Sequence, residues 1–289
     1  MANNNARAAG TGPSASPGRD SAFAAPRWTA PRWTAPRWTA PRWTAPRWTA
    51  GGILLLLLFW ECAARLRGSE LLLPGPLPVL RRCIRLIGTE RFLRSLAESG
   101  LRVLLGMAIS VPLGIMAGAA AGLDRRAGAL LKPLFQVISA TPVMSVILIA
   151  FLWFGQERTP VFTAFLMIFP VTAAAVIAGV SSLDPKLKEL FAAYRLSRKE
   201  RFWSLYLPGI APFILGSLRS GLSLCWKVVV AAEVLIQPRR ALGTGMQAAK
   251  SQLETAELFA WTAGTVIAAA LSQALLGLIL KQAQRRRGR

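Results

Sequence analysis

Long uncharged apolar runs dominate this chain between residues 51 and 280. A helix needs about 20 mostly apolar residues to cross the hydrocarbon core of a bilayer, where its backbone polar groups must be satisfied internally. We therefore predict an all-α integral membrane protein with a transmembrane domain over 51–281 and a basic cytoplasmic tail over 282–289. Its six predicted transmembrane helices, of which the first is short and contains Glu61, are 51–64, 101–123, 130–155, 161–183, 210–236 and 259–280. In the second, small residues at Gly106, Gly114, Gly118 and Gly122 would let another helix approach closely.

Charge agrees with a membrane location. The chain has 35 Lys and Arg against 13 Asp and Glu, a formal net charge of +22, yet 53% of its residues are hydrophobic. Cations at the ends of spans face anionic headgroups, so membrane lipid is a predicted partner. Nucleic acid is not, because apolar runs interrupt the basic residues. Lys and Arg outside the spans are more numerous on the side of the termini, which predicts a plasma (inner) membrane protein with both termini cytoplasmic.

Residue types that carry enzyme chemistry are scarce. The sequence has no histidine, and Cys62, Cys83 and Cys225 lie far apart, so we predict no metal site. No phosphate-binding loop of the Walker type is present, because Lys250-Ser251 follow alanine rather than glycine. We predict no catalytic residues and no cofactor.

Residues 1–50 form a predicted disordered N-terminal arm. Residues 26–50 are five copies of Pro-Arg-Trp-Thr-Ala. A proline every five residues interrupts both helical and strand hydrogen bonding, so we expect no helix over these repeats. Arg and Trp favour the headgroup layer, but an expanded repeat without function is the simpler explanation.

The connection between the first two predicted spans contains an amphipathic pattern typical of a helix at the membrane interface. Its apolar positions are Leu80, Ile84 and Ile87, and its basic positions are Arg81, Arg82 and Arg85.

The segment 184–208, between the fourth and fifth predicted spans, begins with signals for a short helix. Asp184 followed by Pro185 is typical of an N-cap and a first helical residue. Apolar residues then recur at helical spacing and form one face, namely Leu187, Leu190, Phe191 and Tyr194.

A second short helix is predicted directly after the first. Ser197 and Glu200 have the spacing of a capping box, and Pro208 predicts an end near Leu207. The result is a cytoplasmic helix-turn-helix with basic residues around apolar ones. Its spacing fits docking into a partner's groove and attachment to the membrane surface equally well.

Residues 189–208, ELFAAYRLSRKERFWSLYLP, resemble the "EAA" coupling loop of binding-protein-dependent ABC transporter permeases. Glu189 matches the glutamate of that motif, and Leu207-Pro208 match its closing pair. One residue departs from the motif, because Arg195 replaces the glycine between the two helices, where glycine most easily adopts a left-handed turn.

Further matches resemble the nitrate, sulfonate and taurine branch of these permeases. They are Leu73-Pro74-Gly75-Pro76, Leu152-Trp153-Phe154-Gly155, Pro212, Gly216, Leu218-Arg219, Trp226, Ala231-Ala232-Glu233 and Leu242-Gly243-Thr244-Gly245.

The resemblance implies an ATP-driven importer of a small anionic solute such as nitrate, a sulfonate or taurine. It implies a homodimer of this chain, cytoplasmic ABC ATPase subunits docked on the coupling loop, and an extracytoplasmic solute-binding protein. ATP would then be bound by the partner subunit. The alternative is a membrane-anchored scaffold or assembly protein without transport activity, whose complexes would lack an ATPase.

Charged residues inside the predicted spans are candidates for a translocation path, since charge in a bilayer is costly. Lys227 lies in mid-span, where a cation suits an anionic solute. A salt bridge from Lys227 to Glu61 or Glu233 is an equal alternative. The full candidate set is Arg219, Trp226, Lys227 and Glu233.

Overall fold

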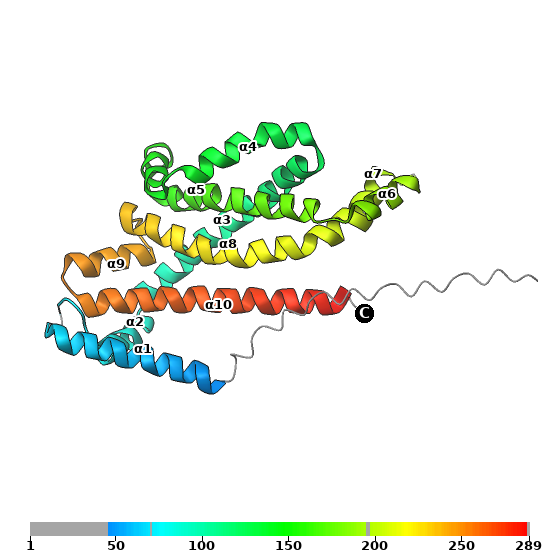
Figure 1. Ribbon diagram of the computed structural model, residues 1–289. Coiled ribbons are helices and arrows are strands. Elements are labelled where there is room, and N and C mark those ends of the chain that lie inside the picture. Colours follow the sequence, from blue (N-terminus) through cyan, green and yellow to red (C-terminus); the bar gives the residue numbers. More distant parts are fainter. Residues whose placement is uncertain (1–45, 70, 195–196, 288–289) are drawn as a thin grey trace, which may run out of the picture. The chain divides into compact units, whose positions relative to one another are not determined.

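The computed structural model describes residues 46–69, 71–194 and 197–287, and every regular element in these ranges is a helix. The chain forms two units, Met1–Gly51 and Gly52–Arg289, and residues 46–51 are the described part of the first. The all-helical prediction is confirmed. In chain order (Figure 1) the helices are α1 (Pro46–Arg67), α2 (Pro76–Ile87), α3 (Glu90–Leu123), α4 (Arg125–Ala140), α5 (Val143–Ser181), α6 (Pro185–Ala193), α7 (Arg198–Arg201), the π-helical turn η1 (Phe202–Tyr206), α8 (Leu207–Ile236), α9 (Leu242–Ser251) and α10 (Thr255–Arg287).

Helices α3, α5 and α8 form the centre of the larger unit, with α3 and α8 both packed along α5. The predicted close approach through small residues is confirmed on the α5-facing side of α3. A Cβ added to Gly114 would lie 2.7 Å from Cβ of Thr172, and one added to Gly118 would lie 2.6 Å from the Ala173 carbonyl oxygen. Such distances leave no room for a side chain, so glycine sets the separation of the two helices.

Among the described residues, four helical stretches are long and apolar enough to cross a membrane. They are Glu90–Leu123, Val143–Ser181, Lys199–Ile236 and Thr255–Gln282. These contain the second, fifth and sixth predicted spans and all of the fourth except residues 182 and 183. The first predicted span lies within α1, where the large apolar side chains of residues 53–59 are exposed.

The third predicted span is not one helix, and that prediction is wrong. Helix α4 ends at Ala140 and α5 begins at Val143. Thr141 is extended (φ −72°, ψ 126°) because Pro142 follows it, and a residue before proline is disfavoured in the helical region.

The predicted break between the third and fourth spans, over 156–160, is also wrong. Gly155 is the residue of α5 with a non-helical conformation (φ 68°, ψ −175°), and residues 156–160 are helical. Pro160 is tolerated because it lies just after this kink, where a missing N–H breaks few helical hydrogen bonds.

The fifth Pro-Arg-Trp-Thr-Ala copy, residues 46–50, is the first part of α1, so the expectation that no repeat is helical is wrong there. Pro46 is the first residue of that helix, a position whose N–H has no intrahelical partner in any case. The first four copies lie outside the described residues.

Helix α2 confirms the predicted amphipathic helix but buries a different face. Val79, Cys83 and Leu86 are buried, and α2 packs on α10. The predicted apolar positions, Leu80, Ile84 and Ile87, are 55%, 66% and 41% exposed.

Candidate functional site

A carboxylate buried in the protein interior is the most distinctive feature of the bundle. Glu233, on α8, has no exposed surface. The Ser99 hydroxyl lies 2.8 Å from both carboxylate oxygens and shares its one proton between them, and one oxygen lies 3.0 Å from the Arg102 guanidinium. The backbone N–H of Gly243 donates to the other oxygen at 3.3 Å. The charge of Glu233 is therefore satisfied by α3 and by the start of α9, as a buried charge requires.

Arg102 extends this network to α5. Its guanidinium, on a side chain that is 6% exposed, reaches the Glu157 carboxylate at 2.6 Å. It also donates to the Arg240 carbonyl at 2.9 Å. Glu157 in turn accepts the backbone N–H of Arg239 at 3.0 Å. One arginine thus joins α3, α5 and the turn between α8 and α9.

The turn itself is shaped by two special positions. Gln237 ends α8 in the left-handed conformation (φ 55°, ψ 62°). A Cβ on Gly243 would lie 2.4 Å from the Val234 nitrogen, so only glycine allows α9 to return this closely to α8. Next to it, the Leu242 N–H donates to Ser99 at 3.0 Å. The Leu-Gly-Thr-Gly sequence therefore places backbone donors on the buried network.

The four candidate path residues do not converge. Glu233 lies in the buried network, and the Trp226 indole donates to Ser272 on α10 at 2.8 Å. Arg219 and Lys227 are exposed along α8. Neither cation has an ion pair within residues 46–69, 71–194 and 197–287.

The predicted pairing of Lys227 with Glu61 or Glu233 is wrong. Glu61 pairs with Arg65, four residues further along α1, at 2.7 Å. Glu233 pairs with Arg102 at 3.0 Å. Arg102 forms the pair because α3 crosses α8 at this level, while Lys227 projects from the exposed side of α8.

Sequence reasoning missed Ser99, Arg102 and Glu157 as members of this network. Arg102 falls in the second predicted span and Glu157 between the third and the fourth, and neither was a predicted site residue. A usable signal existed in the spacing, because Ser99 and Arg102 are three residues apart and share one helix face.

The described part of the segment 184–208 contains α6, α7, η1 and the first two residues of α8. Its predicted caps are present, since the Lys186 N–H donates to the Asp184 carboxylate at 2.9 Å. In the capping box, the Ser197 N–H donates to Glu200 at 2.8 Å and the Glu200 N–H donates to the Ser197 hydroxyl at 3.3 Å. Arg195 lies outside the described residues.

The predicted end of the second helix at Leu207 is wrong. From α7 the chain continues through η1 into α8 without a break. The Leu207 N–H bonds to the Phe202 carbonyl, a π-type hydrogen bond that lengthens the turn before Pro208. A widened turn accommodates proline, which cannot donate a backbone hydrogen bond.

The apolar face of α6 is left uncovered. Leu187 is 44% exposed, Leu190 49% and Tyr194 73%, while Phe191 is half-buried. Glu189 is exposed on the same helix. A short helix with an apolar face open to its surroundings is typical of a docking surface.

The buried network and α6 lie at opposite ends of the bundle. Figure 1 shows α6 and α7 at one end of α8 and α9 at the other. Helix α8 has 30 residues, which corresponds to about 45 Å at the rise of an α-helix. The two regions can therefore influence each other through the helices between them, but not by contact.

Glycine-packed helices that are long and apolar enough to cross a membrane are the architecture of an integral membrane protein. Residues 110–287 match the family described as binding-protein-dependent transport system inner membrane component. The taurine transport system permease protein TauC of Escherichia coli K12 is 33% identical over 238 residues, which are 80% of this chain and 85% of TauC. The chain belongs to this family of ABC transporter permease subunits and is not an enzyme, because ATP hydrolysis resides in a separate subunit.

Other relatives and solved structures agree with this assignment. The nitrate import permease protein NrtB of Synechocystis is 28% identical over 198 residues, covering 65% of this chain and 71% of NrtB. A bacterial ABC transporter involved in alginate import has the same fold, with a TM-score of 0.56 at 15% identity over 83% of this chain and 96% of that one. The methionine transporter MetNI, in an inward-facing conformation, gives a TM-score of 0.50 at 16% identity, covering 71% of this chain and 97% of that one.

Proposed function

We propose that this chain is the permease of an ATP-driven importer of a small anionic solute, and that a cytoplasmic ATPase moves it through α6 and α7. The open apolar face of α6 carries this proposal. A membrane permease has no hydrolytic activity of its own, so it needs a surface on which a motor acts. Leu187, Leu190 and Tyr194 offer such a surface on a capped helix, and the next described helix, α7, leads through η1 into α8.

The same proposal sets the topology. With 184–208 on the cytoplasmic side, six spans would place both termini there. A homodimer with two ATPase subunits and an extracytoplasmic solute-binding protein completes the transporter. The family description, which names a binding-protein-dependent system, supports the last of these partners.

The exposed face of α8 is the proposed translocation path. Pro212, Gly216, Arg219 and Lys227 follow one another at helical spacing and are all exposed. In a homodimer this face would meet its copy across a central path. Two unpaired cations on it would attract an anion.

The solutes named for the relatives support transport of a small ion or zwitterion by this chain, but they do not identify which one. Among these relatives, TauC is named for taurine, NrtB for nitrate and CmpB of Synechococcus elongatus for bicarbonate. We propose nitrate, a sulfonate, taurine or a similar solute.

Lys227→Ala should lower uptake of the transported anion, while Lys227→Arg keeps the charge and most of the activity. Radiolabelled uptake into proteoliposomes tests both.

The ATPase docking is tested by charge reversal on α6. Glu189→Lys, or deletion of 187–194, should abolish co-purification of the ATPase while membrane insertion is kept. Glu254→Lys is the control: it reverses a partly exposed charge at the opposite end, where it also breaks the ion pair with Arg82, and it should leave ATPase recovery unchanged. ATPase recovered at the wild-type level with Glu189→Lys would refute the docking site.

A further inference from the structure

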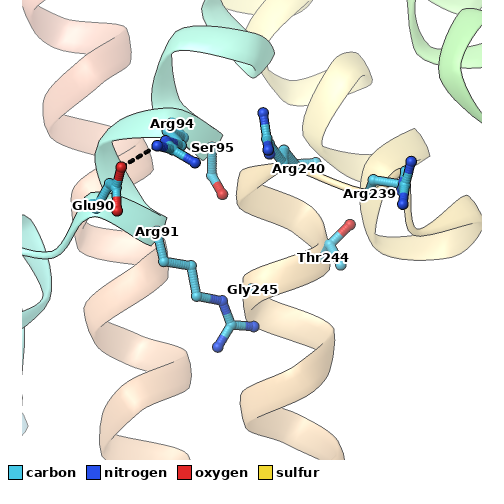
Figure 2. Close-up of a pocket in the computed structure, with 9 residues that line it drawn as sticks. Glu90, Arg91, Arg94, Ser95, Arg239, Arg240, Thr244 and Gly245 are labelled. Carbon is cyan, nitrogen blue, oxygen red and sulfur yellow. Dashed lines mark hydrogen bonds and ion pairs between the residues drawn. The ribbon is translucent and has the colours of Figure 1, made fainter.

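Four arginines surround a hollow of about 280 Å³ at the end of the bundle remote from α6 (Figure 2). Arg91 and Arg94 come from the first turns of α3. Arg239 and Arg240 come from the turn between α8 and α9. The hollow therefore combines two segments that are far apart in sequence and both lie beyond the ends of the predicted spans.

The positive charge of the hollow is only partly balanced. Arg94 pairs with Glu90, and Arg240 lies 3.8 Å from Glu98. Arg91 lies above the Trp261 ring, with 5.8 Å from its guanidinium carbon to the ring centre. In the described part of the chain, neither Arg91 nor Arg239 has a carboxylate partner. Two guanidinium groups thus remain available to an anion.

Ser95 provides a second, independent indication of a ligand. Its side chain lines the hollow and is only 4% exposed. Its hydroxyl makes no hydrogen bond to any residue that the structure describes, and Figure 2 shows it directed towards the hollow, beside Arg94. Because this oxygen is open to the hollow and not sealed in the interior, its O–H is free to donate to an oxyanion there.

The walls of the hollow are held in place before any ligand arrives. Thr244 donates to the Pro238 carbonyl at 2.7 Å, and the Arg239 N–H donates to Glu157. A Cβ on Gly245 would come within 2.5 Å of the Trp261 ring, so the α9 wall is packed without space. A preformed site loses little entropy on binding.

We propose that this hollow receives a carboxylate side chain of the solute-binding protein when that protein docks on the extracytoplasmic side of the permease. The inference rests on the proposed function, which places α6 in the cytoplasm and hence this end outside. Bidentate arginine–carboxylate bonds and the Ser95 hydroxyl would bind the carboxylate.

A protein carboxylate fits better than the other anions that could reach the hollow. An anionic lipid surface would be repelled by Glu98 and Glu157, which line an adjoining hollow together with Arg239 and Arg240. A mixed pattern of charges instead suits a partner surface of complementary pattern. The transported solute is not the occupant, because the hollow is lined by α3 and the α8–α9 turn rather than by the exposed face of α8.

The test uses the complete transporter in lipid nanodiscs, with ATP hydrolysis measured as its solute-binding protein is titrated. The double variant Arg91→Glu, Arg239→Glu should raise the half-maximal concentration of binding protein by at least about tenfold, because a binding pair becomes a repulsive one. Ser95→Ala, which keeps the charge, should raise it about two- to tenfold. Basal hydrolysis and recovery of the ATPase should not change.

Arg85→Glu is the control, because Arg85 is exposed on α2, outside the hollow. An unchanged titration for the double variant, or an equal shift for Arg85→Glu, would overturn the proposal. So would a shift that vanishes when phosphatidylglycerol is replaced by phosphatidylcholine, because the hollow would then hold a headgroup. Failure of the wild-type chain to recover any ATPase would instead contradict the proposed function.

Discussion

The two ends of the bundle satisfy their side chains in opposite ways. At the α9 end, Glu233 and Arg102 are buried, and each has several partners within the chain. At the α6 end, Leu187, Leu190 and Tyr194 are exposed, and the start of the helix is capped by the Asp184 side chain. The buried network of the first end is complete within one chain, while the second end has an apolar surface that a partner can cover.

This difference matters because the ends are joined by the same helices. Helices α5 and α8 run from the capped segment to the buried network, and they pack on each other along their length. A push on α6 would therefore reach a region whose helices are fixed to one another by charge. Such a clamp lets the helices move together rather than slide separately.

The largest loss of stability is expected from breaking the ion pair between Arg102 and Glu233. Arg102→Ala leaves the Glu233 carboxylate buried without its cation, a change that costs about 3–5 kcal/mol. We expect a clear loss of thermal stability in detergent, measured by fluorescence-detected size-exclusion chromatography after heating. Arg219→Ala is the control, because Arg219 is exposed and has no ion pair in the described ranges.

A double variant sharpens this result. Arg102→Met with Glu233→Gln removes both charges, so it should recover much of the stability lost in Arg102→Ala. If the single and double variants were equally unstable, packing rather than charge would hold this end together.

A smaller loss of stability is expected from widening the contact between α3 and α5. A Cβ on Gly118 meets the Ala173 carbonyl at 2.6 Å, while one on Gly216 meets nothing within 4 Å. Gly118→Ala should therefore cost about 1–3 kcal/mol through strain, and Gly216→Ala should be neutral or slightly stabilising. The same heating assay compares them, and equal melting temperatures would show that α3 and α5 can separate freely.

Loss of a cap should have a still smaller and local effect. Ser197→Ala removes one side of the capping box with Glu200, a change worth about 1 kcal/mol. Faster amide hydrogen exchange is expected in residues 198–206, with no change around Glu233. Faster exchange at both ends would mean that the cap supports the whole bundle.

Local patterns predicted local structure well. The caps at Asp184 and Ser197, the helical spacing of α6 and the close glycine contacts of α3 follow from interactions between near neighbours or from the size of one residue. Such local signals can be recognised from the amino-acid sequence alone.

Contacts between distant residues were not predicted. Arg102 and Glu233 are 131 residues apart, and nothing in either neighbourhood reveals that α3 and α8 cross there. The helix breaks at Pro142 and Gly155 were missed for a related reason. They depend on backbone geometry, which hydropathy does not encode. The uncovered face of α2 likewise depends on which side α10 occupies.

The smallest effect on stability should accompany one of the largest effects on function. Leu190→Ser exchanges a side chain that is 49% exposed, so the melting temperature should barely change, since surface substitutions usually stay within about 0.5 kcal/mol. Recovery of the ATPase should nevertheless fall severalfold, because a few apolar side chains buried in a partner's groove carry much of the binding energy. Leu80→Ser, on the exposed face of α2 at 55% exposure, is the matched control and should keep full recovery. Equal loss in both variants would mean that general hydrophobicity, and not α6, binds the ATPase, whereas a selective loss would show that the apolar face of α6 is a specific docking surface.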